Sequence, residues 1–242
     1  MTEPGMTPPG GRAPLINAPL PLTVFAVLLI ALHGVREFAP QGFQNEILYH
    51  GALIPERFWG WLTGAFPGPI GVPAYGNALE AAAPLALSAL IHGDWFHVVL
   101  NAAFWVAVGK PVLEMISGLR GRGGAGAAAV LFILFFLSQA AGGAVYYLVH
   151  NPYGPVAVGA SGGVSGVLGA LFLMRDGARA RILSRNFISV AVIFTIANAL
   201  LAFMGPAMLG AGIAWEVHLG GFAAGALIGR FLIWDALRRA GP

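Results

Sequence analysis

Six apolar segments alternate with polar or glycine- and proline-rich stretches along the 242 residues of the chain. Each segment comes close to the roughly 20 residues that an α-helix needs to cross the hydrocarbon core of a bilayer. The predicted spans are residues 20 to about 33, 94 to about 115, 125 to about 149, 158–174, 187–204 and 213–234. This pattern predicts an all-α, polytopic membrane protein with six transmembrane helices.

The segments between these spans differ in length and character. The longest, residues 34–93, is predicted to be the first external loop, and its stretch 55–64 sets two tryptophans beside an acid–base pair. Tryptophan and charged residues together are typical of an element that lies at the membrane interface. Gly205 and Pro206 predict the turn between the fifth and sixth spans, because proline interrupts helices.

Composition agrees with a membrane protein and limits its chemistry. Hydrophobic residues make up 57% of the chain and charged residues only 10%, against about 25% charged in a soluble domain. The absence of cysteine excludes disulfides and thiolate chemistry. Residues 1–19 are predicted to be a disordered cytoplasmic tail, residues 20–235 the six-helix transmembrane domain, and residues 236–242 a short cytoplasmic tail.

Lysine and arginine are divided unevenly between the two sides that six alternating spans create. The side with the N-terminus, the second and fourth loops and the C-terminus holds eleven of the thirteen, and the other side holds only Arg36 and Arg57. The positive-inside rule therefore predicts that both termini are cytoplasmic. The basic residues fall in small groups between spans and form no continuous basic face, so nucleic-acid binding is not expected.

Polar residues that can carry chemistry lie near the external ends of three predicted spans. His97 and Asn101 are four residues apart, on one face of the second span. Ser161 opens the fourth span, and His218 lies one to two turns into the sixth. Ionisable residues within a span are costly and usually functional. Because these three spans run in the same direction, all four residues are expected at the same shallow depth.

Small residues form a strip along each of two predicted helices. The strips consist of Gly162, Gly166 and Gly169 in the fourth span and of Gly221, Gly225 and Gly229 in the sixth. Small residues let helix backbones approach closely in lipid. We therefore expect these two helices to pack directly against each other, so that Ser161 and His218 can share a proton.

A serine, a histidine and further hydrogen-bond donors are the groups that nucleophilic acyl transfer requires. A serine hydroxyl is a weak nucleophile until a base takes its proton, and histidine suits that task. The oxyanion needs preorganised donors, which the backbone N–H of Ser161 and the side chains of Asn101 and His97 can provide. Glu216 points to a different side of the helix from His218, so the sequence predicts a dyad without an acid.

Each of these residues also has a structural interpretation. Ser161 can be a small packing residue, Asn101 an interhelical hydrogen-bonding group and His218 a buried hydrogen-bonded histidine. His92 is predicted to anchor a loop. A histidine metal site would lack the carboxylate partners and the HExxH motif of a metalloprotease, so neither a metal nor another cofactor is expected.

Two of these groups resemble motifs of the rhomboid family of intramembrane serine proteases. The run Gly159-Ala-Ser161-Gly162 is similar to the GxSG motif of that family. His97 and Asn101, separated by three residues, are similar to its HxxxN motif. GxSG alone is a weak signal, whereas the two motifs on their expected helices are much more specific.

A third motif completes the resemblance. His218, followed by Gly220 and Gly221, is similar to the histidine and paired glycines of the final helix in rhomboid proteases. The likeness covers about residues 20–235 and includes the order and spacing of the motifs. It implies a six-transmembrane-helix rhomboid-like bundle. In that bundle Gly159, Gly162, Gly220 and Gly221 would be motif residues that also let the helices pack closely.

The resemblance also implies an activity. It makes the chain a serine endopeptidase that cleaves transmembrane segments of membrane proteins near the external face, through an acyl-enzyme. Ser161 would be the nucleophile, His218 the base, and His97 and Asn101 would help to hold the oxyanion. The implied partners are transmembrane substrates and the lipid bilayer, without nucleic acid or metal. The implied location is the bacterial inner (cell) membrane, as a multi-pass protein.

Two features depart from the family pattern. Some members have an aromatic residue four positions after the nucleophile, stacked on the base, where this chain has Ser165. The Trp-Arg pair that precedes the second span in the family is absent, and only Arg57-Phe-Trp59 stands nearby. The main alternative is a non-catalytic rhomboid-like protein that binds membrane clients. A small transporter is more distant, since no internal repeat is visible and the polar residues are shallow.

Overall fold

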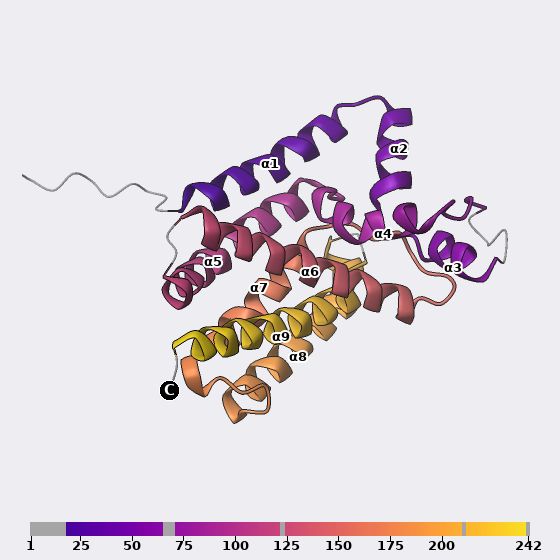
Figure 1. Ribbon diagram of the computed structural model, residues 1–242. Helices are drawn as coiled ribbons and strands as arrows, with labels where there is room; N and C mark the ends of the chain where they lie inside the picture. Colours follow the sequence, from indigo (N-terminus) through magenta and orange to yellow (C-terminus); the bar gives the residue numbers. More distant parts are fainter. Residues whose placement is uncertain (1–17, 65–70, 122–123, 210–211, 241–242) are drawn as a thin grey trace, which may run out of the picture.

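The computed structural model describes residues 18–64, 71–121, 124–209 and 212–240, which fold as a bundle of helices (Figure 1). The predicted tail, residues 1–19, lies outside the described part except for its last two residues. The helices are α1 (Leu20–Glu37), α2 (Gln41–Gly51), α3 (Pro55–Thr63), α4 (Ala78–Leu87), α5 (Trp95–Arg120), α6 (Ala125–Val149), α7 (Ser161–Met174), α8 (Arg185–Leu209) and α9 (Trp215–Ala240), with short 3₁₀ turns η1 (Ser88–Leu90) and η2 (Gly177–Arg179). The prediction of an all-α membrane fold is confirmed.

Five of the described helices, α1, α5, α6, α8 and α9, are long and apolar enough to cross a membrane. The sixth apolar segment differs from the others, because α7 has only 14 residues and begins at Ser161. At 1.5 Å per residue it measures about 21 Å, less than the roughly 30 Å of the hydrocarbon core. Most of its side chains are buried, so α7 is a short central helix that its neighbours surround.

Helix ends show where the hydropathy pattern was incomplete. The predicted turn at Gly205 and Pro206 is wrong, because α8 continues through both residues to Leu209. Transmembrane helices tolerate proline because neighbouring groups satisfy the backbone that it leaves free. The sixth span is also longer than predicted and extends to Ala240. The predicted start of the second span near Asp94 is confirmed, since the Asp94 side chain accepts a hydrogen bond from the backbone N–H of His97 at 2.8 Å.

Helix α7 packs most extensively against α9, and α6 and α5 also contact it. A β-carbon added to Gly221 would overlap the carbonyl oxygen of Gly162, and one added to Gly225 would overlap that of Gly166. Contacts this close are possible only between glycines at these positions. The predicted direct packing of the two glycine strips is confirmed.

An aromatic cluster joins α1 to α5 and α6. The ring of Phe25 meets Trp105 at 5.2 Å and Phe135 at 5.4 Å, in edge-to-face arrangements. Trp105 is fully buried, and its indole Nε1 donates to the carbonyl oxygen of Leu22 at 3.1 Å. A buried indole N–H needs such a partner, so this bond sets the position of α1 along α5.

The long first loop is largely helical, and α2, α3 and α4 gather at the end of the bundle opposite the C-terminus (Figure 1). Arg57 of α3 is buried, with its guanidinium 3.6 Å from the ring centre of Tyr49 and 4.2 Å from that of Tyr75. It also donates hydrogen bonds to the carbonyl oxygens of Tyr49 and Pro73. One arginine therefore holds three parts of this loop together.

The close packing of α7 and α9 predicts a large effect of one methyl group. We expect Gly225→Ala to lower the free energy of unfolding by about 1–3 kcal/mol, because the helices must separate to admit the β-carbon. Thermal unfolding in detergent micelles measures the change. Gly118→Ala in α5 is the matched control, since nothing lies within 4 Å of its β-carbon. Equal losses in the two variants would contradict the contact.

Candidate active site

The turn that leads into α7 places Ser161 at the first position of the helix. Gly159 has a φ of +126°, a conformation that side chains disfavour, and a β-carbon there would lie 2.7 Å from the imidazole of His97. Its backbone N–H donates to the carbonyl oxygen of Ser88 at 2.8 Å. The first glycine of the Gly-x-Ser-Gly run is therefore required by both its backbone conformation and the lack of space.

Gln139 of α6 holds the same turn from the opposite side. Its amide nitrogen donates to the carbonyl oxygen of Gly159 at 3.0 Å and to the hydroxyl of Ser88 at 3.1 Å. Its amide oxygen accepts from the backbone N–H of Gly163 at 2.8 Å. Gln139 was not among the predicted site residues, although a single amide in the middle of an apolar span was a visible signal.

His92 anchors the turn from the loop before α5. Its Nε2 accepts a hydrogen bond from the backbone N–H of Ala160 at 3.4 Å, and Arg36 donates to its carbonyl oxygen at 2.8 Å. Burial lowers the pKa of His92 to about 3, with smaller contributions from His97, His33 and the Arg36 guanidinium. The ring therefore stays neutral and able to accept. The interpretation of His92 as a loop anchor is confirmed.

Ser161 and His218 meet across the interface of α7 and α9. The distance between Ser161 Oγ and His218 Nε2 is 2.7 Å, which is a normal hydrogen-bond length for these groups. The two residues are 57 positions apart in the chain, and the glycine strips bring their helices together. The geometry is that of a nucleophile hydrogen-bonded to a base.

The second nitrogen of His218 also has a partner. Its Nδ1 lies 2.7 Å from the amide oxygen of Asn198, which α8 contributes. The amide nitrogen of Asn198 donates to the carbonyl oxygen of Phe194 at 3.0 Å. Asn198 was not among the predicted site residues. Its signal was a single amide within a strongly apolar segment, which hydropathy alone does not connect to His218.

His97 and Asn101 occupy the first two turns of α5 and border the turn before Ser161. A β-carbon on Gly159 would lie 3.7 Å from the amide nitrogen of Asn101, in addition to its contact with His97. The Asn101 amide nitrogen is buried and has no acceptor among the residues that the structure describes. An unpaired buried donor is costly, so this nitrogen is a polar group beside the turn whose hydrogen bond the described residues do not supply.

The sequence matches the rhomboid domain over residues 80–235. The chain belongs to the rhomboid family. No curated protein matches it. The matched region runs from α4 through most of α9 and contains Ser161, His218, Asn198 and Asn101. As a member of the rhomboid family, the chain is a multi-pass integral membrane protein, and its relatives are generally serine proteases.

Two residues that bear on the resemblance have clear places in this rhomboid fold. Glu216 is paired with His150 at 3.0 Å across α6 and α9, and the described structure gives it no bond to His218. Ser165 is buried on α7, one turn after Ser161, and has no ring to stack on the imidazole. Among the described residues, the side-chain hydrogen-bond partners of His218 are therefore Ser161 and Asn198, and neither is an acid.

A narrow cavity of about 10 Å³ in the rhomboid protein is lined in part by Ser161. Its walls are short or apolar side chains and the backbone of the turn: Leu53, Gln139, Ala157, Val158, Gly159, Ser161, Ala214 and Val217. Leu53 and Ala157 also form an antiparallel β-bridge beside it. The cavity is no larger than the space that a single water molecule needs, which is about 10–15 Å³.

The neutral state of His92 predicts a pH dependence of stability. In the unfolded chain His92 takes up a proton near its ordinary pKa of 6.5, whereas the folded chain resists protonation until about pH 3. Stability is therefore lost as the pH falls below 6.5, by about 1.4 kcal/mol for each pH unit from this group. His92→Gln keeps an acceptor but does not titrate, so we expect a shallower loss.

Thermal unfolding in detergent, compared between about pH 7.5 and about pH 5, measures this slope. The two proteins should be most alike at the higher pH, where His92 is neutral in both folded and unfolded states. If His92→Gln loses stability as steeply as the unchanged protein, the assignment of His92 as a neutral acceptor is wrong.

Proposed function

We propose that this rhomboid-family protein is an intramembrane serine endopeptidase that cleaves transmembrane segments of other membrane proteins. The observation that carries the proposal is the 2.7 Å contact between Ser161 Oγ and His218 Nε2 at the head of a buried helix. A serine that served only to pack two helices would not need a histidine nitrogen directed at its hydroxyl. Their joint presence also disfavours the alternative of a client-binding protein without catalysis.

The first half of the reaction forms an acyl-enzyme. Ser161 Oγ attacks the carbonyl carbon of the scissile peptide, and His218 Nε2 takes the hydroxyl proton. The tetrahedral intermediate then collapses, and His218 gives this proton to the leaving amine as the C–N bond breaks. The C-terminal fragment leaves with the new amino terminus, and Ser161 holds the N-terminal part of the substrate as an ester.

The second half of the reaction is hydrolysis of this ester. His218 takes a proton from water, the resulting hydroxide attacks the ester carbonyl, and the proton then returns to Ser161 Oγ as the acid product leaves. The oxyanion of both intermediates has three candidate donors. The backbone N–H of Ser161 lacks an intrahelical partner because it is at the start of α7, and the side chains of Asn101 and His97 border the same turn.

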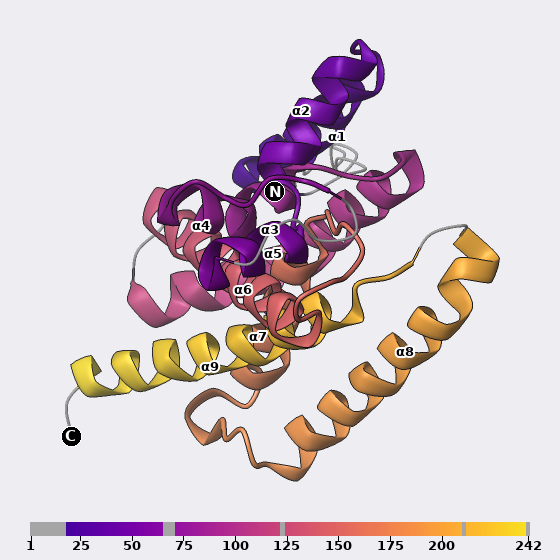
Figure 2. The ribbon, with the colours of Figure 1, turned by 90° about the vertical axis from the view of Figure 1, so that its right-hand side faces the viewer.

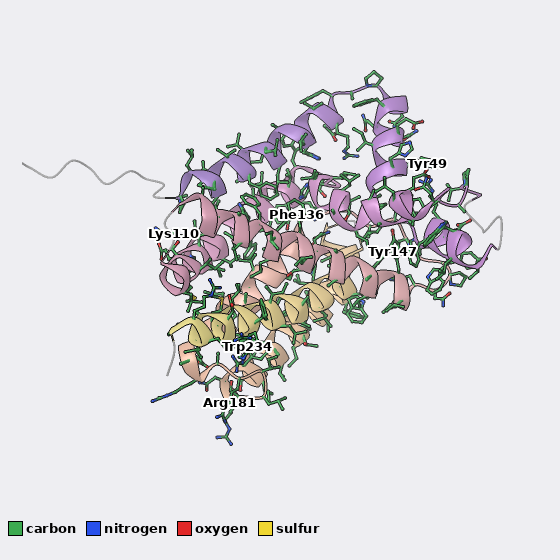
Figure 3. All side chains as sticks on the ribbon, in the orientation of Figure 1. Tyr49, Lys110, Phe136, Tyr147, Arg181 and Trp234 are labelled. Carbon is green, nitrogen blue, oxygen red and sulfur yellow. The ribbon has the colours of Figure 1, made fainter. Side chains whose placement is uncertain are left out.

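The distribution of charge supports cleavage near the external face. Lys110 and Arg181 lie toward the end of the bundle where α9 finishes, whereas Tyr49 and Tyr147 lie toward the opposite end (Figure 3). By the positive-inside rule we propose that the basic end is cytoplasmic. Both termini would then lie on that side, and the helix starts that carry Ser161, His97 and His218 would lie toward the outside. The inner membrane of a bacterium is the location that we propose.

We expect Ser161→Ala and His218→Ala each to abolish cleavage of a model transmembrane substrate by purified protein in detergent or liposomes. The first variant has no nucleophile, and the second has no base. Ser117→Ala removes a hydroxyl whose hydrogen bond, among the described residues, goes to the Leu113 carbonyl of its own helix, and this variant should cleave as the unchanged protein does. Proteolysis retained by Ser161→Ala would contradict the mechanism. Client binding without any cleavage would favour the non-catalytic alternative.

Labelling by a serine-directed fluorophosphonate provides a second test of the same pair. The reagent reacts only with a serine that a base activates, so the unchanged protein and Ser117→Ala should label and Ser161→Ala should not. Equal labelling of all three proteins would show that Ser161 is not activated.

We expect Asn101→Ala to lower kcat by about 10²- to 10³-fold with little change in KM, as for the loss of other oxyanion donors. The buried amide nitrogen has no other acceptor among the described residues, so removing it should cost little stability. Steady-state cleavage kinetics with thermal unfolding as the control measure both effects. An unchanged kcat would assign Asn101 to packing.

A further inference from the structure

We propose that Asn198 is a positioning residue, which selects the tautomer of His218 and aims its basic nitrogen at Ser161. The inference rests on the proposed protease function, in which His218 acts as the base. None of the three motifs includes Asn198, which enters the site from α8 through its 2.7 Å contact with His218 Nδ1.

The orientation of the Asn198 amide follows from its second contact. One end of the amide lies 3.0 Å from the carbonyl oxygen of Phe194, one turn earlier in α8. A carbonyl oxygen only accepts hydrogen bonds, so the end that faces it must be the NH₂ group. The amide oxygen is thereby directed at His218 Nδ1.

The tautomer of His218 follows from this orientation. An amide oxygen only accepts, so His218 Nδ1 must carry the hydrogen of this bond. In a neutral imidazole the other nitrogen is then bare. The lone pair of Nε2 therefore faces the Ser161 hydroxyl at 2.7 Å, which is the arrangement that a general base needs. A single backbone carbonyl, that of Phe194, determines the direction of the whole chain of bonds.

Asn198 is a buried polar residue on a helix that is otherwise mostly exposed. Helix α8 stands at the edge of the bundle, beyond α7 and α9 (Figure 2), and most of its side chains are exposed. Asn198 is an exception, because it is almost fully buried. Phe187 and Phe194 stack on Phe222 of α9, at 5.8 and 4.4 Å between ring centres. These ring contacts set α8 against α9 and bring Asn198 level with His218.

The geometry also explains why an amide can serve here without an acid. An uncharged acceptor selects the same tautomer as a carboxylate but leaves no unpaired charge in an apolar site. It stabilises the imidazolium less than a carboxylate would. In a Ser-His-Asp triad, a change that imposes the wrong tautomer costs about 10⁴ in kcat. The loss of Asn198 should cost less than this, because the imidazole can still adopt the productive tautomer part of the time.

The test compares three variants in α8. Asn198→Leu has a similar volume and no acceptor, whereas Asn198→Asp keeps an acceptor for His218 Nδ1. Thr195→Val is the control, because Thr195 is exposed on the same helix and its hydroxyl, within the described part of the chain, donates to the carbonyl of Ala191. All three variants are made in the full chain, and thermal unfolding in detergent shows that each is folded.

The first readout is independent of proteolysis. Nitrogen-15 NMR of histidine-labelled protein at mildly alkaline pH distinguishes the two tautomers, with the His218 signals identified by their loss in His218→Gln. We expect a protonated Nδ1 and a bare Nε2 in the unchanged protein and in Thr195→Val, and a mixture of tautomers in Asn198→Leu. A protonated Nε2 in the unchanged protein, or unaltered signals in Asn198→Leu, would overturn the proposal.

The second readout is cleavage kinetics. We expect Asn198→Leu to lower kcat by about 10- to 100-fold with KM nearly unchanged, between the effect of one neutral hydrogen bond and that of a lost triad acid. Asn198→Asp should recover much of this loss, and the acidic limb of kcat/KM should move to higher pH because a carboxylate stabilises the imidazolium. A packing role predicts the opposite order, with leucine active and aspartate inactive.

The two readouts separate this inference from the proposed function. If the unchanged protein cleaves nothing but shows the Nδ1 tautomer, which Asn198→Leu disturbs, the hydrogen bond stands and the protease proposal fails. If the protein cleaves through Ser161 and His218 while Asn198→Leu keeps full kcat, the protease proposal stands and the role of Asn198 is wrong.

Discussion

Close contact between two glycine strips is the constraint on which the rest of this structure depends. The carbonyl oxygens of Gly162 and Gly166 occupy the space where side chains on Gly221 and Gly225 would lie. In lipid, helices gain little from burying apolar surface against each other, so contact of this kind supplies much of the attraction between them. The same contact sets the distance at which Ser161 of α7 and His218 of α9 share a hydrogen bond. One contact therefore sets both the packing of α7 against α9 and the distance between Ser161 and His218.

A short central helix creates a second problem, which the polar residues of the site solve. Because α7 begins only at Ser161, the chain before it is irregular backbone within the bundle, and such backbone must find internal partners. Gln139, Ser88 and His92 provide them, each through a bond to the turn around Gly159. These groups bring polar atoms close to Ser161, although lipid-facing helices surround the turn.

The spans were predictable because their signal is local. A helix satisfies its own backbone, so a run of apolar residues is enough to identify it, and Ala125–Val149 was predicted with the bounds that α6 has. The turn at Gly205 and Pro206 was predicted wrongly, because proline rules from soluble proteins are weaker in a membrane. Residues 34–93 were predicted to be a long external loop with an interfacial element at 55–64. The structure forms three short helices there, α2, α3 and α4, and the buried Arg57 contacts Tyr49 and Tyr75.

The sequence by itself determined the membrane class, the glycine strips, and the candidates Ser161, His218, His97 and Asn101, since their spacing and depth can be counted along a helix. Only the tertiary structure decided which side chains His218 meets. Asn198 and Gln139 are visible in the sequence as single amides in apolar segments, but their partners depend on how far each helix is rotated about its axis. That rotation is set by packing against several neighbours together, and no local pattern records it. The tertiary structure therefore brings α8 to the site through the amide of Asn198, which bonds to His218.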